Sequence, residues 1–159
     1  MELFQTWNPD EALSHLVMLA VAYLLALPIG WNREREERSA GLRTFPLVAM
    51  AACGFVIIAI EVIGADSEQQ SRIMEGLMTG IGFIGGGAIL KQGDRATGTA
   101  TAASLWATGA IGAAVGYGQL DIAVIMTVVI FLTLSVLSPI KKAVEGEMQD
   151  ATATGTPKA

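Results

Sequence analysis

Few side chains in this 159-residue chain could carry out catalysis. It has one histidine, His15, and one cysteine, Cys53, so neither an internal disulfide nor a cysteine-based metal cluster can form. It has no nucleophile–histidine–acid set, no HExxH motif and no P-loop. Residues 80–85 (GIGFIG) fit the GxGxxG pattern, but they lie inside a long apolar stretch, whereas a dinucleotide site needs a preceding strand. We therefore expect no enzyme.

A row of hydroxyl groups is the first pattern that could act on a ligand. Thr97, Thr101, Ser104 and Thr108 are spaced i, i+4, i+7 and i+11, which places them on one face of a helix. Two interpretations stay open. The hydroxyls bond to a neighbouring helix or to carbonyls of their own helix, or they line a path for a solute or ion. Trp106, in the middle of the same segment, carries an indole N–H that would need a buried partner.

Most charged side chains lie where a helix dipole favours them, because acids stabilise helix N-termini and bases stabilise C-termini. The acids that open predicted helices are Asp10, Glu11, Glu75 and Asp121, and the bases that close them are Arg33, Arg35, Lys91, Lys141 and Lys142. The dipole explains these positions without any function.

Arg43 and Glu61 oppose the dipole of one predicted helix, since Arg43 precedes its N-terminus and Glu61 lies in its last turns. Arg43 could contact an acid of the run 33–37, such as Glu34, or a lipid phosphate, or a partner protein. Glu61 could pair with Arg72 or bind a cation. We predict no metal site and no cofactor, and leave Mg²⁺ open as a bound ion.

These groups must be positioned by helices that lie in a membrane. The chain is 52% hydrophobic and 16% charged, whereas an ordinary soluble domain is about a quarter charged. About twenty apolar residues span a bilayer core, and five segments approach that length: about 11–31, 44–64, 73–90, 99–116 and 121–140. The sequence predicts an all-α membrane protein with five transmembrane helices in a domain over 1–142, followed by a short disordered cytoplasmic tail over 143–159.

The basic residues predict an orientation. With five spans, one side of the membrane receives Arg72, and the other receives Arg33, Arg35, Arg38, Arg43, Lys91, Arg95, Lys141, Lys142 and Lys158. Lys and Arg are enriched in cytoplasmic loops, so the N-terminus should lie outside and the C-terminus in the cytoplasm. Because these bases flank membrane helices, we expect the lipid bilayer and no nucleic acid as a partner.

Glycines are spaced for close helix packing. Three pairs have GxxxG spacing, which lets two backbones approach: Gly76/Gly80, Gly82/Gly86 and Gly112/Gly116. Predicted helix 73–90 has small residues on more than one face, so we expect it to be central, with a break near 85–87 as the alternative. The glycine faces would serve a homo-oligomer as well as the core of one chain.

Three ordered blocks resemble the MgtC/SapB family of bacterial inner-membrane proteins. The blocks are residues 30–35 (GWNRER) with 40–44 (AGLRT), similar to the family's first loop; 72–73 (RI) followed by 80–87 (GIGFIGGG), similar to its glycine-rich helix; and 99–112 (TATAASLWATGAIG), similar to its next block. The resemblance covers about residues 15–140, and the spacings between blocks are kept.

The resemblance implies a five-helix, multi-pass protein of the bacterial inner membrane. It also implies a link to growth in low magnesium and, in some members, to survival inside host cells. Members have been viewed as Mg²⁺ transporters or as regulators of partners such as the ATP synthase. Two departures stand out: Asn32 replaces the usual Glu, and the 17 residues after Lys142 are too few for the soluble C-terminal domain of many virulence-linked members. We therefore expect a short form.

Two functions remain. We favour a non-enzymatic regulator of magnesium or envelope ion homeostasis that acts through a membrane protein partner, because no acid lies deep in the predicted spans. The alternative is a small cation (Mg²⁺) or solute transporter with a path between predicted helices 73–90 and 99–116. The candidate partner- or ion-binding residues are Arg33, Glu34, Arg43, Glu61, Arg72, Glu75, Thr101, Ser104, Trp106 and Thr108.

Overall fold

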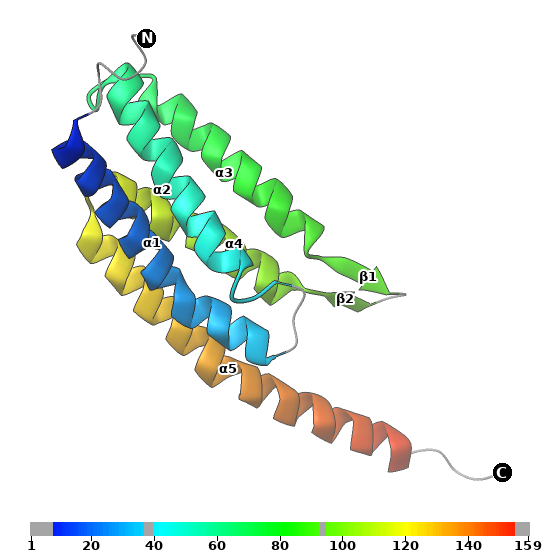
Figure 1. Cartoon of the computed structure of the whole chain (residues 1–159). Coiled ribbons are helices and arrows are strands. Elements are labelled where there is room, and N and C mark those ends of the chain that lie inside the picture. Colours follow the sequence, from blue (N-terminus) through cyan, green and yellow to red (C-terminus); the bar gives the residue numbers. More distant parts are fainter. Residues whose placement is uncertain (1–7, 37–39, 93–94, 155–159) are drawn as a thin grey trace.

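The structure of the chain, a computed structural model, describes residues 8–36, 40–92 and 95–154. These residues form five helices and a hairpin of two short strands (Figure 1). The helices are α1 (Pro9–Arg35), α2 (Thr44–Ile63), α3 (Gln70–Gly87), α4 (Thr99–Gly116) and α5 (Leu120–Thr154), and the strands are β1 (Leu90–Gln92) and β2 (Arg95–Thr97). The five predicted helices are all present.

Helix α1 begins where its capping signals predict. The side chain of Asn8 accepts a hydrogen bond from the Asp10 N–H at 3.1 Å, and Pro9 takes the first helical position, where its missing N–H costs nothing. Arg33 and Arg35 lie in the last turn, at the negative end of the helix dipole. The sequence therefore defines both ends of this helix locally.

Helix α4 is the centre of the bundle. It packs against each of the other four helices, and Figure 1 shows it behind α1 and α2, with α3 on one side and α5 on the other. Ten of its residues are buried, whereas α3 buries three: Gln70, Ile81 and Gly85. The expectation that the glycine-rich helix is central is therefore wrong. Small residues let α4, not α3, fit among four neighbours.

The chain between α3 and α4 forms a hairpin that the sequence did not predict. Helix α3 ends at Gly87, three residues before the predicted end at 90. Strands β1 and β2 pair antiparallel, with Leu90 opposite Thr97 and Lys91 opposite Ala96. Gly98 then adopts φ 85°, and a Cβ there would overlap the carbonyl oxygen of Ala88, so this position needs glycine. Residues 93–94, between the two strands, lie outside the described part of the chain.

Helix α5 continues to Thr154, well beyond the predicted end at 140. It therefore includes most of the segment 143–159 for which we predicted a disordered tail. The reason is local: the segment 143–149 (AVEGEMQ) is rich in strong helix formers, which extend an existing helix at little cost. Residues 155–159 lie outside the described part.

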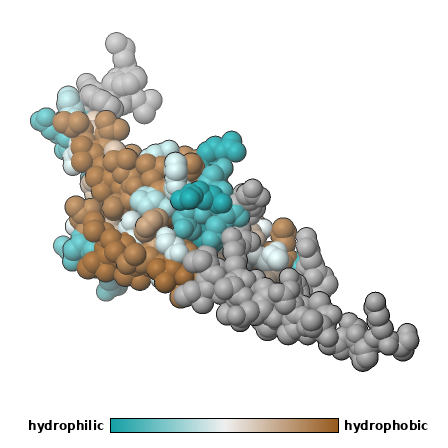
Figure 2. Space-filling view, turned by 90° about the horizontal axis from the view of Figure 1, so that it is seen from below, coloured by the Kyte–Doolittle hydropathy of each residue, from teal (hydrophilic) through white to brown (hydrophobic). Residues whose placement is uncertain are grey.

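Within the described residues, three helices are long and apolar enough to cross a membrane: Pro9–Arg35, Thr44–Ile63 and the part Leu120–Leu137 of α5. Large apolar side chains are exposed on the bundle, among them Phe83, which is 84% exposed. Figure 2 shows one face on which hydrophobic residues form a broad band, with hydrophilic residues toward its edges. An aqueous surface rarely carries so large an apolar area, so the chain is a membrane protein.

The six glycines with GxxxG spacing divide into two groups. In α4, a Cβ on Gly112 would overlap the carbonyl oxygen of Ala49 in α2, and a Cβ on Gly116 would lie 2.7 Å from the Cβ of Val56. This is the close approach that GxxxG spacing allows. The other four glycines of that spacing lie in α3 and would meet no atom within 4 Å: Gly76, Gly80, Gly82 and Gly86. Their close packing, expected from the sequence, is not made within the described chain.

The substitution Gly112→Ala should lower the free energy of unfolding by about 1–3 kcal/mol, because the new methyl group would push α2 and α4 apart. The matched control is Gly76→Ala, whose methyl group meets open space. Unfolding of the purified protein in detergent, followed by circular dichroism, compares the two variants. Equal stability would contradict the close approach of α4 to Ala49.

Candidate functional site

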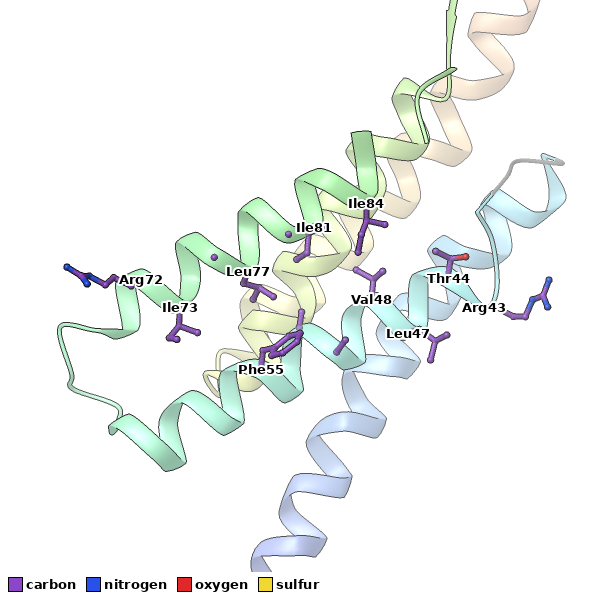
Figure 3. Close-up of a pocket in the computed structure, with 14 residues that line it drawn as sticks. Arg43, Thr44, Leu47, Val48, Phe55, Arg72, Ile73, Leu77, Ile81 and Ile84 are labelled. Carbon is purple, nitrogen blue, oxygen red and sulfur yellow. The ribbon is translucent and has the colours of Figure 1, made fainter. Parts of the chain in front are cut away.

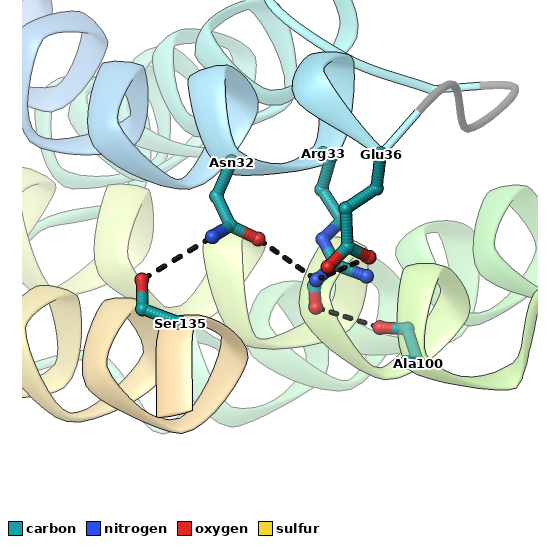
Figure 4. A network of polar contacts seen from close by, with 6 residues as sticks. Asn32, Arg33, Glu36, Ala100 and Ser135 are labelled. Carbon is teal, nitrogen blue, oxygen red and sulfur yellow. Dashed lines mark hydrogen bonds and ion pairs between the residues drawn. The ribbon is translucent and has the colours of Figure 1, made fainter. Parts of the chain in front are cut away.

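A buried arginine lies at the end of α1. The side chain of Arg33 is 1% exposed. Its Nη2 donates a hydrogen bond to Oδ1 of Asn32 at 2.8 Å and forms an ion pair with Oε2 of Glu36 at 3.3 Å (Figure 4). A charge withdrawn from water needs such partners, since an uncompensated buried charge costs several kcal/mol. Sequence reasoning explained Arg33 by the helix dipole alone and did not predict its burial.

The polar contacts of Arg33 extend through Asn32 to another helix. Nδ2 of Asn32 donates to the hydroxyl of Ser135 in α5 at 3.2 Å, and Figure 4 shows Ala100 of α4 beside the same cluster. The Ala100 carbonyl accepts a hydrogen bond from the Ser104 hydroxyl at 2.6 Å. We call the group Asn32, Arg33, Glu36 and Ser135 the arginine cluster. It ties the end of α1 to α5, and neither Asn32 nor Ser135 was among the predicted site residues.

The turn between α1 and α2 is closed by Glu34. Its Oε2 accepts the backbone N–H of Leu42 at 3.1 Å. A Cβ on Gly41 would displace this carboxylate, and a Cβ on Gly30 would lie 3.2 Å from the Gly41 carbonyl oxygen, so glycine at both positions allows this close packing. The segment that resembles a family loop is thus a compact corner in which each small residue makes room for a neighbour.

Arg43 stands outside this corner. It is the N-cap of α2, its side chain makes no capping hydrogen bond, and it is exposed. The acids that we expected as partners are engaged elsewhere: Glu34 with the Leu42 N–H and Glu36 with Arg33. Within the described residues, which omit Glu37, no acid forms an ion pair with Arg43. Its guanidinium is therefore available to a molecule outside the bundle.

Glu61 pairs with a residue that the sequence did not predict. Its Oε1 lies 3.8 Å from Nε2 of His15 in α1, and both side chains are partly exposed. The expected pair between Glu61 and Arg72 is not formed, and Arg72 and Glu75 are exposed at the start of α3. In the described ranges, no three side chains of His, Cys, Asp or Glu are placed to hold a metal ion.

The hydroxyl face of α4 is buried. Thr101, Ser104 and Thr108 are 2%, 4% and 0% exposed. Ser104 bonds to a carbonyl of its own helix, which is the simpler of the two interpretations. Thr97 lies in β2 rather than on the helix, and its hydroxyl donates to the Leu90 carbonyl at 3.3 Å. The hydroxyls of Thr101, Ser104 and Thr108 therefore belong to the packed interior, whereas Thr97 is exposed.

Trp106 faces outward. It is 48% exposed, so the buried partner that we expected for its indole N–H is not required. It lines a groove of about 490 Å³ between α3, α4 and α5, together with Met74, Met78 and Met126. The hydroxyl face of α4 does not line this groove, because the groove contacts the other side of the helix, at Gly109 and Ala113 and their neighbours.

A second polar contact holds the opposite end of the bundle. Nε2 of Gln70 donates to the Gly64 carbonyl at 2.9 Å, and the Tyr117 hydroxyl donates to Oε1 of Gln70 at 3.0 Å. The single amide thereby joins the end of α2, the start of α3 and the end of α4. No sequence pattern predicts this contact, because Gly64, Gln70 and Tyr117 belong to different parts of the chain.

A larger groove of about 730 Å³ runs between α2 and α3 (Figure 3). Its lining is apolar except for Thr44 and two arginines, and Figure 3 shows Arg43 and Arg72 at opposite ends. Two of the open glycines, Gly76 and Gly80, line it. The groove therefore has the shape and polarity for an apolar chain with a charged end.

The MgtC family profile matches residues 19–143. The chain belongs to the MgtC family. The match includes the arginine cluster, the corner held by Glu34, and both grooves. No solved structure matches the chain.

Relatives of this MgtC-family chain come from distant bacteria. Protein SrpB of Synechococcus elongatus is 40% identical over 129 residues, which are 74% of this chain and 71% of SrpB. Protein MgtC of Brucella abortus is 39% identical over 140 residues, 87% of this chain and 57% of that protein. Protein MgtC of Salmonella typhimurium is 36% identical over 116 residues, 73% and 49% respectively. The chain thus spans about half the length of these MgtC proteins.

The substitution Arg33→Met in this MgtC-family protein should lower the free energy of unfolding by about 3–5 kcal/mol, because it breaks the ion pair with the mostly buried Glu36 carboxylate. Arg35→Met, in the same turn but exposed, is the control and should have little effect. Denaturation in detergent measures both. Similar stabilities of the two variants would show that the arginine cluster does not stabilise the fold.

Proposed function

We propose that this protein is a non-enzymatic, multi-pass protein of the bacterial inner membrane that regulates magnesium or envelope ion homeostasis through a membrane protein partner. The observation that carries the proposal is the placement of Arg43. Its side chain is exposed at the start of α2, while the neighbouring acids Glu34 and Glu36 are engaged within the bundle. An exposed arginine without an internal role suits recognition of a partner. The link to magnesium rests on the family resemblance.

The sparse intramembrane charge supports regulation over transport. Ion relays use acids deep in the bilayer, whereas the acids of the described helices lie near helix ends, as Glu61 does in α2. The hydroxyls of Thr101, Ser104 and Thr108, which a path between α3 and α4 would use, are buried and line neither groove. The transporter alternative therefore has no lining of the expected kind to support it.

We also propose that all five helices span the membrane, with the N-terminus outside and the C-terminus in the cytoplasm. Helices α3 and α4 have 18 residues each, close to the length that a bilayer core requires. Their polar groups lower their hydropathy, but in α4 these groups are shielded by the neighbouring helices. The excess of Lys and Arg at the end of the bundle that carries Arg43 supports the orientation.

Reporter fusions test this arrangement. Green fluorescent protein fused after residue 154 should fluoresce, and alkaline phosphatase at the same position should be inactive, because both report a cytoplasmic location. Alkaline phosphatase inserted at Ser67, between α2 and α3, should be active. If α1, α2 and α5 were the three spans, the β1–β2 hairpin would lie on the outer side of the membrane instead of in the cytoplasm. An active phosphatase inserted in this hairpin would therefore contradict the proposal.

Reconstitution decides between regulator and transporter. Mg²⁺ uptake into liposomes that contain the purified protein should equal uptake into empty liposomes, measured with an entrapped magnesium dye. In cells that depend on this protein for growth at low magnesium, Arg43→Ala should abolish growth while the protein still inserts, and Arg35→Ala should not. Uptake well above that of empty liposomes would overturn the regulatory proposal.

A further inference from the structure

The groove between α2 and α3 is an apolar channel open on one side. Its walls carry Leu47 and Phe55 from α2 and Leu77 from α3, and small residues such as Ala51 and Gly80 widen it. A Cβ on Gly80 would meet no atom within 4 Å, so the described chain leaves this space empty. A volume of about 730 Å³ without internal packing needs an apolar occupant when the helices lie in a membrane.

The length of the groove limits what can occupy it. Its lining runs from Arg43 to Phe55 on α2 and from Arg72 to Ile84 on α3. At about 1.5 Å per residue, twelve steps of a helix cover about 18 Å. A bilayer core is about 30 Å thick, so the groove is little longer than one leaflet. An acyl chain of a single lipid fits this length, whereas a transmembrane helix of a partner or second copy would extend far beyond it.

The two ends of the groove differ in charge. Near Arg72, the exposed side chains include four acids: Glu61, Asp66, Glu68 and Glu75. Near Arg43, in the part of the chain that the structure describes, the first turn of α2 has no acid and the Glu34 carboxylate is held by the Leu42 N–H. An anionic head group is therefore favoured at the Arg43 end and repelled at the other.

We propose that the α2–α3 groove is a binding site for one anionic phospholipid, which lays an acyl chain along the groove. The Arg43 guanidinium and the Thr44 hydroxyl hold the head-group phosphate at the end of the groove (Figure 3). Arginine recognises phosphate through charge-assisted hydrogen bonds, and the N-terminus of α2 adds favourable dipole energy. This site uses the same Arg43 as the regulatory role proposed above, but the two are tested separately, since lipid binding is measurable on the purified protein alone.

Native mass spectrometry of the full chain, released from detergent micelles, tests the site with two probes: phosphatidylglycerol, which is anionic, and phosphatidylcholine, which is not. The wild type should retain one phosphatidylglycerol at least about fivefold more tightly than phosphatidylcholine. Arg43→Gln should lower affinity for phosphatidylglycerol about five- to tenfold, as expected for a lost charged hydrogen bond. The matched control, Arg35→Gln, should bind as the wild type does.

A second pair of variants tests the groove itself. Gly80→Leu fills the groove from α3 without a clash in the protein, so it should fold normally and weaken binding of both lipids. Gly82→Leu is the matched control, because its site is equally open but does not line the groove. Circular dichroism confirms that each variant is folded.

Several outcomes would overturn the proposal. One is equal binding of the two lipids, and another is equal affinity of Arg43→Gln and Arg35→Gln for phosphatidylglycerol. Displacement of the lipid by millimolar inorganic phosphate would show that the site binds a free anion rather than a lipid head group. A dimer that Gly80→Leu abolishes, in the absence of bound lipid, would assign the groove to a second copy of the chain.

Discussion

A guanidinium that water cannot reach must have its charge balanced by its neighbours, and Arg33 is such a group. Glu36 supplies the opposite charge and Asn32 an acceptor, both within one turn of α1. The same asparagine then bonds to Ser135, so the position of α5 is coupled to the end of α1. Because Glu36 is engaged there and Glu34 closes the corner at Leu42, Arg43 is left facing outward. The availability of Arg43 is thus a consequence of the buried charge beside it.

Helix α4 meets a different constraint, that of fitting among four neighbours. Gly112 and Gly116 bring its backbone against α2, and Gly109 accommodates the side chain of Ile81 from α3. A helix surrounded in this way can carry hydroxyl groups, because they do not face lipid and can bond to their own carbonyls, as Ser104 does. Helix α3 packs Gly85 against Ala102 of α4, but its Gly76 and Gly80 stay open and line the groove beside α2. Central packing and the open groove therefore have one origin, the arrangement of small residues on two adjacent helices.

Much of the fold could be predicted because its signals are local. The apolar segments predicted the start of α1 to within about two residues, the start of α2 at Thr44 and the whole range of α4. Partners across helices could not be predicted, since nothing local distinguishes His15 from Arg72 as the neighbour of Glu61. Burial of Arg33 was missed for the same reason: the helix dipole explains a base at that position whether or not other helices cover it. Glycine spacing predicted close packing without identifying which pair of glycines would make it.

The arginine cluster accommodates Asn32 at a position where the related family usually has glutamate. Asn32 uses both ends of its amide: Oδ1 accepts from Arg33, and Nδ2 donates to the Ser135 hydroxyl. A carboxylate could still accept from the guanidinium, and a serine hydroxyl can reverse its role and donate. The geometry is therefore compatible with either residue. With asparagine, position 32 adds no charge beside the ion pair of Arg33 and Glu36, and a neutral side chain costs less than a charged one where the Arg33 side chain is 1% exposed.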